Sequence, residues 1–147
     1  GQPGTERIFW EVGANWAGRD PQAALEWVND LPEGQSQQIG MRGSLNSWAR
    51  RDPTAAGEYL QEMAPSPLRD AAIAGYSTHV VWEDPTAAMS WAESIAAPEQ
   101  RQEAMVEVAR SWQRKGGQGL PEWLDGSGLS AEIQENILTP RDRRHRD

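Results

Sequence analysis

The side chains that could carry catalysis or bind a metal are few in this sequence. The chain has two histidines, His79 and His145, and no cysteine. A thiolate nucleophile, a disulfide and a cysteine-ligated metal are therefore excluded. A histidine without a second histidine or a cysteine nearby is a poor metal site. We expect no metal ligands, and we expect His79 to be structural or to lie on the surface.

Motifs for nucleophilic catalysis and for phosphate binding are missing from the sequence as well. There is no Gly-x-Ser-x-Gly, no phosphate-binding loop and no dinucleotide fingerprint. The glycine-rich residues 116–119 follow no expected strand, and residues 125–128 (DGSG) lack the further acidic ligands of a calcium loop. Glu58 and Glu62 are one helical turn apart, but such a pair on an exposed face is ordinary solvation. We expect no catalytic residues and no cofactor, and hence a protein that is not an enzyme.

A twelve-residue pattern recurs along the chain and organises it. The pattern reads WAGRDPQAALEW from Trp16, WARRDPTAAGEY from Trp48 and VVWEDPTAAMSW from Val80. The Asp-Pro pairs begin at positions 20, 52 and 84, so their spacing is constant. The same spacing relates the aromatic residues Trp27, Tyr59, Trp91 and Trp123. A fixed period of this length is typical of tandem structural repeats.

Each copy of the pattern predicts two helices. The aspartate of an Asp-Pro pair is a good N-cap, and the proline suits the first helical position. Apolar residues then follow at i, i+3, i+4 and i+7, as in Ala24, Trp27, Val28 and Leu31. No stretch shows the sustained alternation of a strand. We expect helices over about 5–18, 21–31, 35–50, 53–63, 67–82, 85–96, 99–115, 120–124 and 130–138, the last of them capped by Ser130.

The repeats are expected to stack, because a single helical hairpin cannot bury its apolar face alone. We expect one all-α domain over residues 1–138, with about 3.5 hairpins and a degenerate C-terminal cap. Small residues at Gly40, Ala72 and Ala104 mark positions where helices could approach closely. Residues 139–147, with four arginines, are expected to be a disordered basic tail. Core positions between neighbouring hairpins are expected for Trp16, Trp27, Trp48, Trp91, Trp112 and Trp123.

The pattern resembles the tetratricopeptide-like branch of the α-solenoids over residues 5–125. The shared features are the hairpin length, the aromatic residue in the first helix, small residues at packing positions and proline at the repeat junction. The period is slightly shorter than the about 34 residues of that family, and the Leu-Gly…Tyr part of its first helix is absent. The chain also resembles bacterial arrays with repeated W-A-x-x-D-P-x-A-A-x-x-W. The resemblance implies a right-handed α-α superhelix and a scaffold that binds another protein.

Tetratricopeptide-like arrays usually bind partners through the polar face of their first helices. That face is mainly acidic or neutral here, so a basic or neutral peptide is the expected partner, although simple solvation explains the same residues. Trp10 and Trp82 lie outside the repeat registers, and either could be exposed as an anchor for a partner. The candidate partner-binding residues are Glu26, Asp30, Glu58, Glu62, Ser90, Glu93, Trp10 and Trp82.

Composition restricts the class of partner further. The net charge of −8 argues against nucleic acid and anionic membranes. No apolar run approaches about 18 residues, so membrane insertion is not expected. An alternative role is a structural subunit of a homo-oligomer or a larger assembly, packed through the ends of the array and an exposed tryptophan. The start at Gly1 without methionine suggests processing, export or a fragment, and the sequence predicts no compartment.

Overall fold

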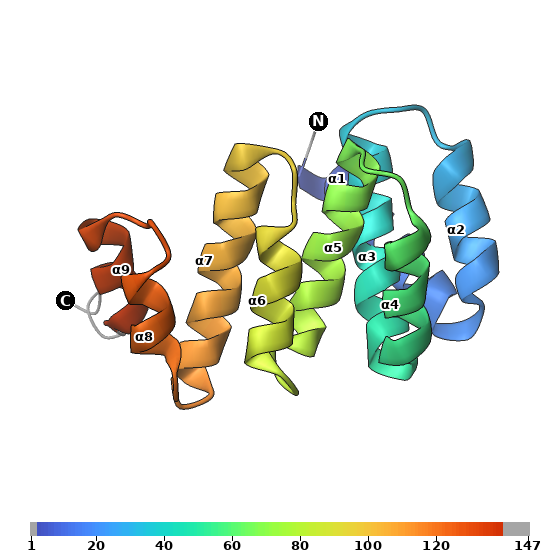
Figure 1. Cartoon of the computed structure of the whole chain (residues 1–147). Coiled ribbons are helices and arrows are strands. Elements are labelled where there is room, and N and C mark those ends of the chain that lie inside the picture. Colours follow the sequence, from blue (N-terminus) through green and yellow to red (C-terminus); the bar gives the residue numbers. More distant parts are fainter. Residues whose placement is uncertain (1–2, 140–147) are drawn as a thin grey trace.

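The described part of the chain is built of helices only. A computed structural model describes residues 3–139, with side chains from Arg7 onward, and it contains no strand in that range (Figure 1). The all-α prediction is confirmed. The predicted tail of residues 139–147 lies, from Pro140 onward, outside the described residues. The helices are α1 (Pro3–Arg19), α2 (Pro21–Asp30), α3 (Gln35–Arg51), α4 (Pro53–Glu62), α5 (Pro67–Val80), α6 (Pro85–Glu93), α7 (Pro98–Arg114), α8 (Leu120–Asp125) and α9 (Ala131–Leu138).

The observed helix ends lie close to the expected ones, and the largest difference is at the end of α6. This helix ends at Glu93 rather than near residue 96. The backbone N–H groups of Ser94 and Ile95 donate to carbonyls only three residues earlier, and the Ser94 hydroxyl donates to the Trp91 carbonyl at 2.6 Å. Such tighter bonds end an α-helix, because the i→i−4 ladder is no longer continued.

The Asp-Pro pairs begin three helices in the same way. The carboxylates of Asp20, Asp52 and Asp84 each accept a hydrogen bond from the N–H three residues later, at 3.1–3.2 Å. In each case proline takes the first helical position. Ser130 caps α9 by the same geometry. The predicted N-caps are confirmed.

The Asp84 cap is expected to make stability depend on pH. The N–H of Ala87 and the hydroxyl of Thr86 donate to its carboxylate and hold its pKa below the usual value. Asp84→Ala should cost about 1 kcal/mol of unfolding free energy at neutral pH. Because the folded pKa is the lower one, this contribution is present above the ordinary aspartate pKa and is lost as the pH falls through the lowered value.

Urea unfolding of the wild type and of Asp84→Ala at several pH values measures this difference. Asp84→Asn is the control, because asparagine caps a helix without titrating. A difference between wild type and alanine variant that stays constant into strongly acidic solution would contradict the charged cap.

Two sets of helices can be distinguished by their contacts. The second helices of the repeats, α1, α3 and α5, pack directly on one another in a row, and α7 extends the row with a looser contact to α5. The first helices α2, α4 and α6 each lie against the two second helices next to them in the sequence. Figure 1 shows the chain running from α2 at one side to α8 and α9 at the other.

Glycines allow the close approach of the second helices. A Cβ on Gly43 of α3 would lie 2.6 Å from the carbonyl oxygen of Trp10 on α1. A Cβ on Gly75 of α5 would meet the carbonyl oxygen of Arg42 on α3 in the same way. The side-chain amide of Asn46 then donates to the Gly75 carbonyl at 3.2 Å. The predicted small residue Gly40 also lies at a close approach, because a Cβ on Gly13 of α1 would lie 2.6 Å from its carbonyl oxygen, and its other side faces side chains of α2.

Aromatic pairs join each second helix to the first helix that follows it. The pairs are Trp16–Trp27, Trp48–Tyr59, Tyr76–Trp91 and Trp112–Trp123, with ring centroids 5.5–6.5 Å apart. Val80 occupies the repeat position of an aromatic residue, and Tyr76 supplies the ring from one turn earlier in α5. The Tyr76 hydroxyl also donates to the Pro53 carbonyl at 3.2 Å.

The core prediction is wrong for Trp16. Trp16 is 36% exposed. The apolar residues Ile8 (59%) and Val12 (37%) on the same helix are exposed as well. Among the described helices, α1 packs against α2 and α3, so one side of it is left uncovered. Trp48 and Trp112 are buried, while Trp27, Trp91 and Trp123 are half-buried.

A further set of positions recurs with the period of the repeat and consists of polar side chains. Gln37, Arg69 and Arg101 each donate to a carbonyl near the end of the preceding first helix, at 3.0–3.2 Å. The acceptors are the carbonyls of Val28, Leu60 and Ile95. The carbonyls of Val28 and Leu60 also accept the backbone N–H three residues later, so the side chain is a second donor to each. These bonds tie each first helix to the second helix of its own repeat.

Candidate functional site

The partner-binding residues predicted from the sequence lie on the surface but on separate elements. Exposed positions are found for Glu26 and Asp30 on α2, Glu58 and Glu62 on α4, and Ser90 and Glu93 on α6. The Glu93 carboxylate is already engaged, because it accepts a hydrogen bond from the indole of Trp123 at 2.9 Å. None of them lines the hollows found among the described residues.

The two tryptophans outside the repeat registers differ in exposure. Trp10 on α1 is half-buried, and its backbone lies against Gly43. Trp82, just after α5, is 44% exposed, and the guanidinium of Arg114 lies 5.9 Å from its ring centroid. This cation–π contact already covers part of the indole.

The histidine within the repeats is placed near a single carboxylate. His79 is half-buried near the end of α5, and its Nε2 lies 3.8 Å from the Glu83 carboxylate. Over residues 7–139 no group of three or more His, Asp or Glu side chains is arranged to hold a metal ion. No helix in the described part of the chain is long and apolar enough to cross a membrane.

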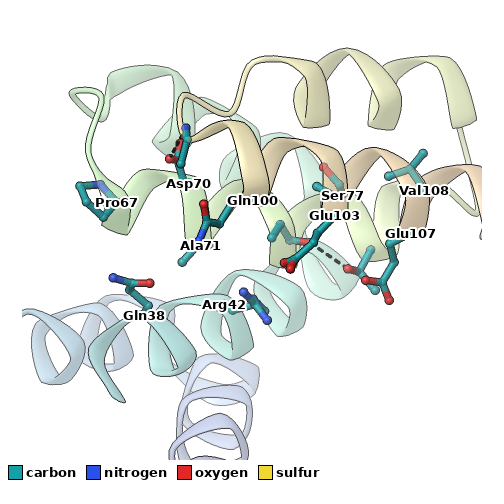
Figure 2. Close-up of a pocket in the computed structure, with 14 residues that line it drawn as sticks. Gln38, Arg42, Pro67, Asp70, Ala71, Ser77, Gln100, Glu103, Glu107 and Val108 are labelled. Carbon is teal, nitrogen blue, oxygen red and sulfur yellow. Dashed lines mark hydrogen bonds between the residues drawn. The ribbon is translucent and has the colours of Figure 1, made fainter. Parts of the chain in front are cut away.

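A groove of about 300 Å³ lies between α3, α5 and α7 (Figure 2). Its floor consists of small apolar side chains, namely Ala71, Ala74, Ala104 and Val108. Its rim is polar, with Gln38 and Arg42 from α3, Thr78 from α5, and Gln100, Glu103 and Glu107 from α7. Polar residues outnumber apolar ones in the lining, so the groove is more polar than the usual small-molecule site.

The register of the repeat explains why the groove is open. Gly43 lies against the backbone of Trp10, and Gly75 lies against that of Arg42, each on the preceding second helix. One repeat further along the sequence, Glu107 of α7 takes the position of the glycine, and Ala74 of α5 takes the position of Arg42. A contact too close for a Cβ atom cannot accept a glutamate side chain. The helix α7 packs more loosely on α5 than α5 does on α3, and Glu107 and Ala74 both line the groove between them.

A second link between neighbouring helices is also missing at this place. Asn46 of α3 donates a hydrogen bond across to α5, whereas the equivalent residue of α5 is Thr78. The Thr78 hydroxyl donates within its own helix, to the Ala74 carbonyl at 2.8 Å. The α5–α7 contact thus lacks both the glycine and the polar bridge that hold α3 against α5.

One end of the groove is held rigidly by a buried carboxylate. Asp70 of α5 is 7% exposed, and it accepts hydrogen bonds from the backbone N–H groups of Ala96 (3.0 Å) and Ala97 (3.2 Å). These bonds fasten the loop before α7 to α5. Ser77, which also lines the groove, is 1% exposed and its Oγ has no hydrogen-bond partner.

The charged side chains of the rim are unpaired within the described part of the protein. The ion pairs among residues 7–139 are Arg7–Glu11 and His79–Glu83. Glu103 and Glu107, one turn apart on α7, and Arg42, across the groove on α3, belong to neither pair (Figure 2). The opposite walls therefore present a pair of carboxylates and one guanidinium.

A larger and more open hollow, of about 670 Å³, lies between α7 and α9 and shares Glu103 and Glu107 with the groove. It is lined as well by Arg110 and Arg114, and the Nε of Arg110 is buried without a hydrogen-bond partner. This hollow is wider and more open to solvent, so it encloses a ligand less completely than the groove does.

Comparison with known proteins adds nothing to this geometry. No protein-family model, curated protein or solved structure matches the chain. The tetratricopeptide-like resemblance therefore rests on the repeat pattern alone, and the residues of the groove carry the functional argument.

Proposed function

We propose that this protein is a non-enzymatic binding module that holds a short peptide segment of another protein between α3, α5 and α7. The observation that carries the proposal is the groove itself, which lies where Glu107 replaces the glycine of the preceding repeats. A hollow of about 300 Å³ is at the small end of ligand sites and suits a few side chains rather than a whole domain.

The architecture we propose around this site is a short α-solenoid, the right-handed superhelix that the resemblance implies. Two features support it. The contacts of Gly43 and Gly75 repeat with the same offset in sequence, and the aromatic pairs recur in four successive helix pairs. In such arrays each repeat contacts mainly its neighbours, so a change at one junction opens the structure locally.

The polar face of the first helices is the other surface proposed from the sequence. Its acidic residues are exposed on α2, α4 and α6, and none of them lines the groove. Affinity in protein interfaces comes mostly from side chains that become fully desolvated in a pocket. The groove offers such an environment on its apolar floor, so we place the binding site there.

The alternative proposal is a structural subunit. The uncovered apolar residues Ile8, Val12 and Trp16 on α1 support it, because exposed apolar patches often mark protein contacts. In that case the groove would bind no ligand, and substitutions in the groove would not change the binding of any peptide.

Selection of binders from a random peptide display library, on the whole chain, tests the groove. Selected peptides are then measured by fluorescence anisotropy against two variants. Ala74→Met fills the floor, and Glu107→Gly removes the side chain that holds α7 away from α5. Each variant should weaken binding by about tenfold or more, which corresponds to about 1.4 kcal/mol.

The matched control is the double variant Glu58→Lys, Glu62→Lys on α4, which should bind the peptides as the wild type does. Circular dichroism confirms that all variants are folded. Binding that survives in both groove variants and is lost in the α4 variant would move the site to the first helices. Failure to select any peptide that depends on Ala74 would overturn the proposal and favour the structural subunit.

A further inference from the structure

We infer that the segment bound in the groove carries an arginine or a lysine, whose cationic group lies between Glu103 and Glu107. The inference rests on the proposed function, since it names the chemistry of the peptide that the groove holds. It depends on three features of the lining: the paired carboxylates of α7, the negative balance of the groove lining, and the exposed guanidinium of Arg42 on the opposite wall.

The two carboxylates of α7 are suited to share one cation. Glu103 and Glu107 are exposed, lie one turn apart at the rim, and take part in no ion pair among residues 7–139 (Figure 2). Like charges at i and i+4 of a helix repel each other. A guanidinium or ammonium group placed between them relieves this repulsion and forms charge-assisted hydrogen bonds with both.

The remaining charges of the groove favour the same ligand. The lining of the groove contains the carboxylates of Asp70, Glu103 and Glu107 against the guanidinium of Arg42, while Arg110 and Arg114 lie beside the two glutamates in the adjoining hollow. Both oxygens of Asp70 accept from backbone N–H groups, so its charge is held in place at one end of the groove. A cationic ligand is attracted by this balance, and an anionic one is repelled.

Arg42 indicates how a peptide would lie. Arg42, across the groove from the glutamates, has no ion-pair partner among the described residues and can donate to a main-chain carbonyl of the bound segment. Ser77 contributes a buried hydroxyl without a partner at the floor. Arg42 is exposed, so its donors are open to a peptide backbone, whereas the Ser77 hydroxyl is enclosed by protein atoms.

The test repeats the peptide selection on the wild type and on the double variant Glu103→Gln, Glu107→Gln. Glutamine keeps the length of the side chain, so the groove stays open while the charge is removed. Wild-type peptides should be enriched in arginine and lysine, and peptides selected on the variant should not be. A wild-type peptide should bind the variant about 10–100-fold more weakly.

The matched control is Glu58→Gln with Glu62→Gln, which neutralises another exposed glutamate pair one turn apart, on α4. It should leave affinity unchanged. Replacing the basic residue of the peptide by glutamine should weaken binding to the wild type as much as the α7 double variant does, and combining the two changes should add little.

The outcomes separate the inference from the function on which it rests. Peptides that depend on Ala74 but contain no excess of arginine or lysine, and that bind the α7 double variant normally, would overturn the inference and leave the groove as the binding site. An absence of any peptide that depends on Ala74 would overturn both.

Discussion

Replacing Gly75 by alanine is expected to destabilise the protein by about 1–2 kcal/mol net, although alanine is the better helix former. In an isolated helix the same change would stabilise by about 1 kcal/mol. Here the new Cβ would meet the backbone carbonyl of Arg42 on α3, and a backbone cannot move aside as the end of a long side chain can. The helices must separate, and overpacking of this kind costs about 1–3 kcal/mol.

Urea unfolding followed by tryptophan fluorescence measures this effect. The control is Gly126→Ala, since Gly126 is exposed, has a φ of −99°, and has no atom near the position of an added Cβ. It should change stability by less than about 0.5 kcal/mol. If Gly75→Ala is instead more stable than the wild type, α3 and α5 do not touch as described, and the explanation of the groove fails with them.

Replacing Trp112 by alanine should have a still larger effect on stability, about 3–5 kcal/mol. Trp112 is 4% exposed, and its ring lies against Trp123 with centroids 6.5 Å apart. Its indole N–H donates to the Gln118 carbonyl at 3.0 Å. The truncation leaves a cavity between α7 and α8 and a carbonyl without a donor, and both effects destabilise.

Thermal and urea unfolding of Trp112→Ala are compared with those of Trp82→Ala. Trp82 is 44% exposed and makes one cation–π contact with Arg114, so its loss should cost under about 1 kcal/mol. Equal effects of the two truncations would contradict the different burial of the two rings.

The helices and their starting points were predictable because they depend on neighbours in the sequence. An aspartate caps the helix that begins one residue later, and a proline at the next position is accepted for local reasons. Asp20, Asp52 and Asp84 therefore signal their helices without knowledge of the rest of the fold. The apolar period likewise marks the buried face of each helix, whatever it packs against.

Some positions that recur with the repeat are polar, and a search for periodic apolar residues does not find them. Gln37, Arg69 and Arg101 keep the spacing of the repeat, but their side chains are polar, and only the contacts show that each binds the end of the preceding helix. The sequence also did not reveal that Tyr76 supplies the ring that is missing at Val80; only the structure shows this pairing. One turn along a helix moves a side chain little around the axis, so either position reaches Trp91.

The sequence by itself determined an all-helical chain, the beginnings of its helices and the period of its repeat, because capping and periodicity act over a few residues. Only the tertiary structure decided where the helices touch and where they do not. Glu107 follows Gly43 and Gly75 in the register of the repeat, yet its consequence depends on a backbone on another helix, at Ala74, which the linear spacing does not reveal. The groove exists because packing between helices tolerates no side chain at that position, and such a contact is a property of the folded chain.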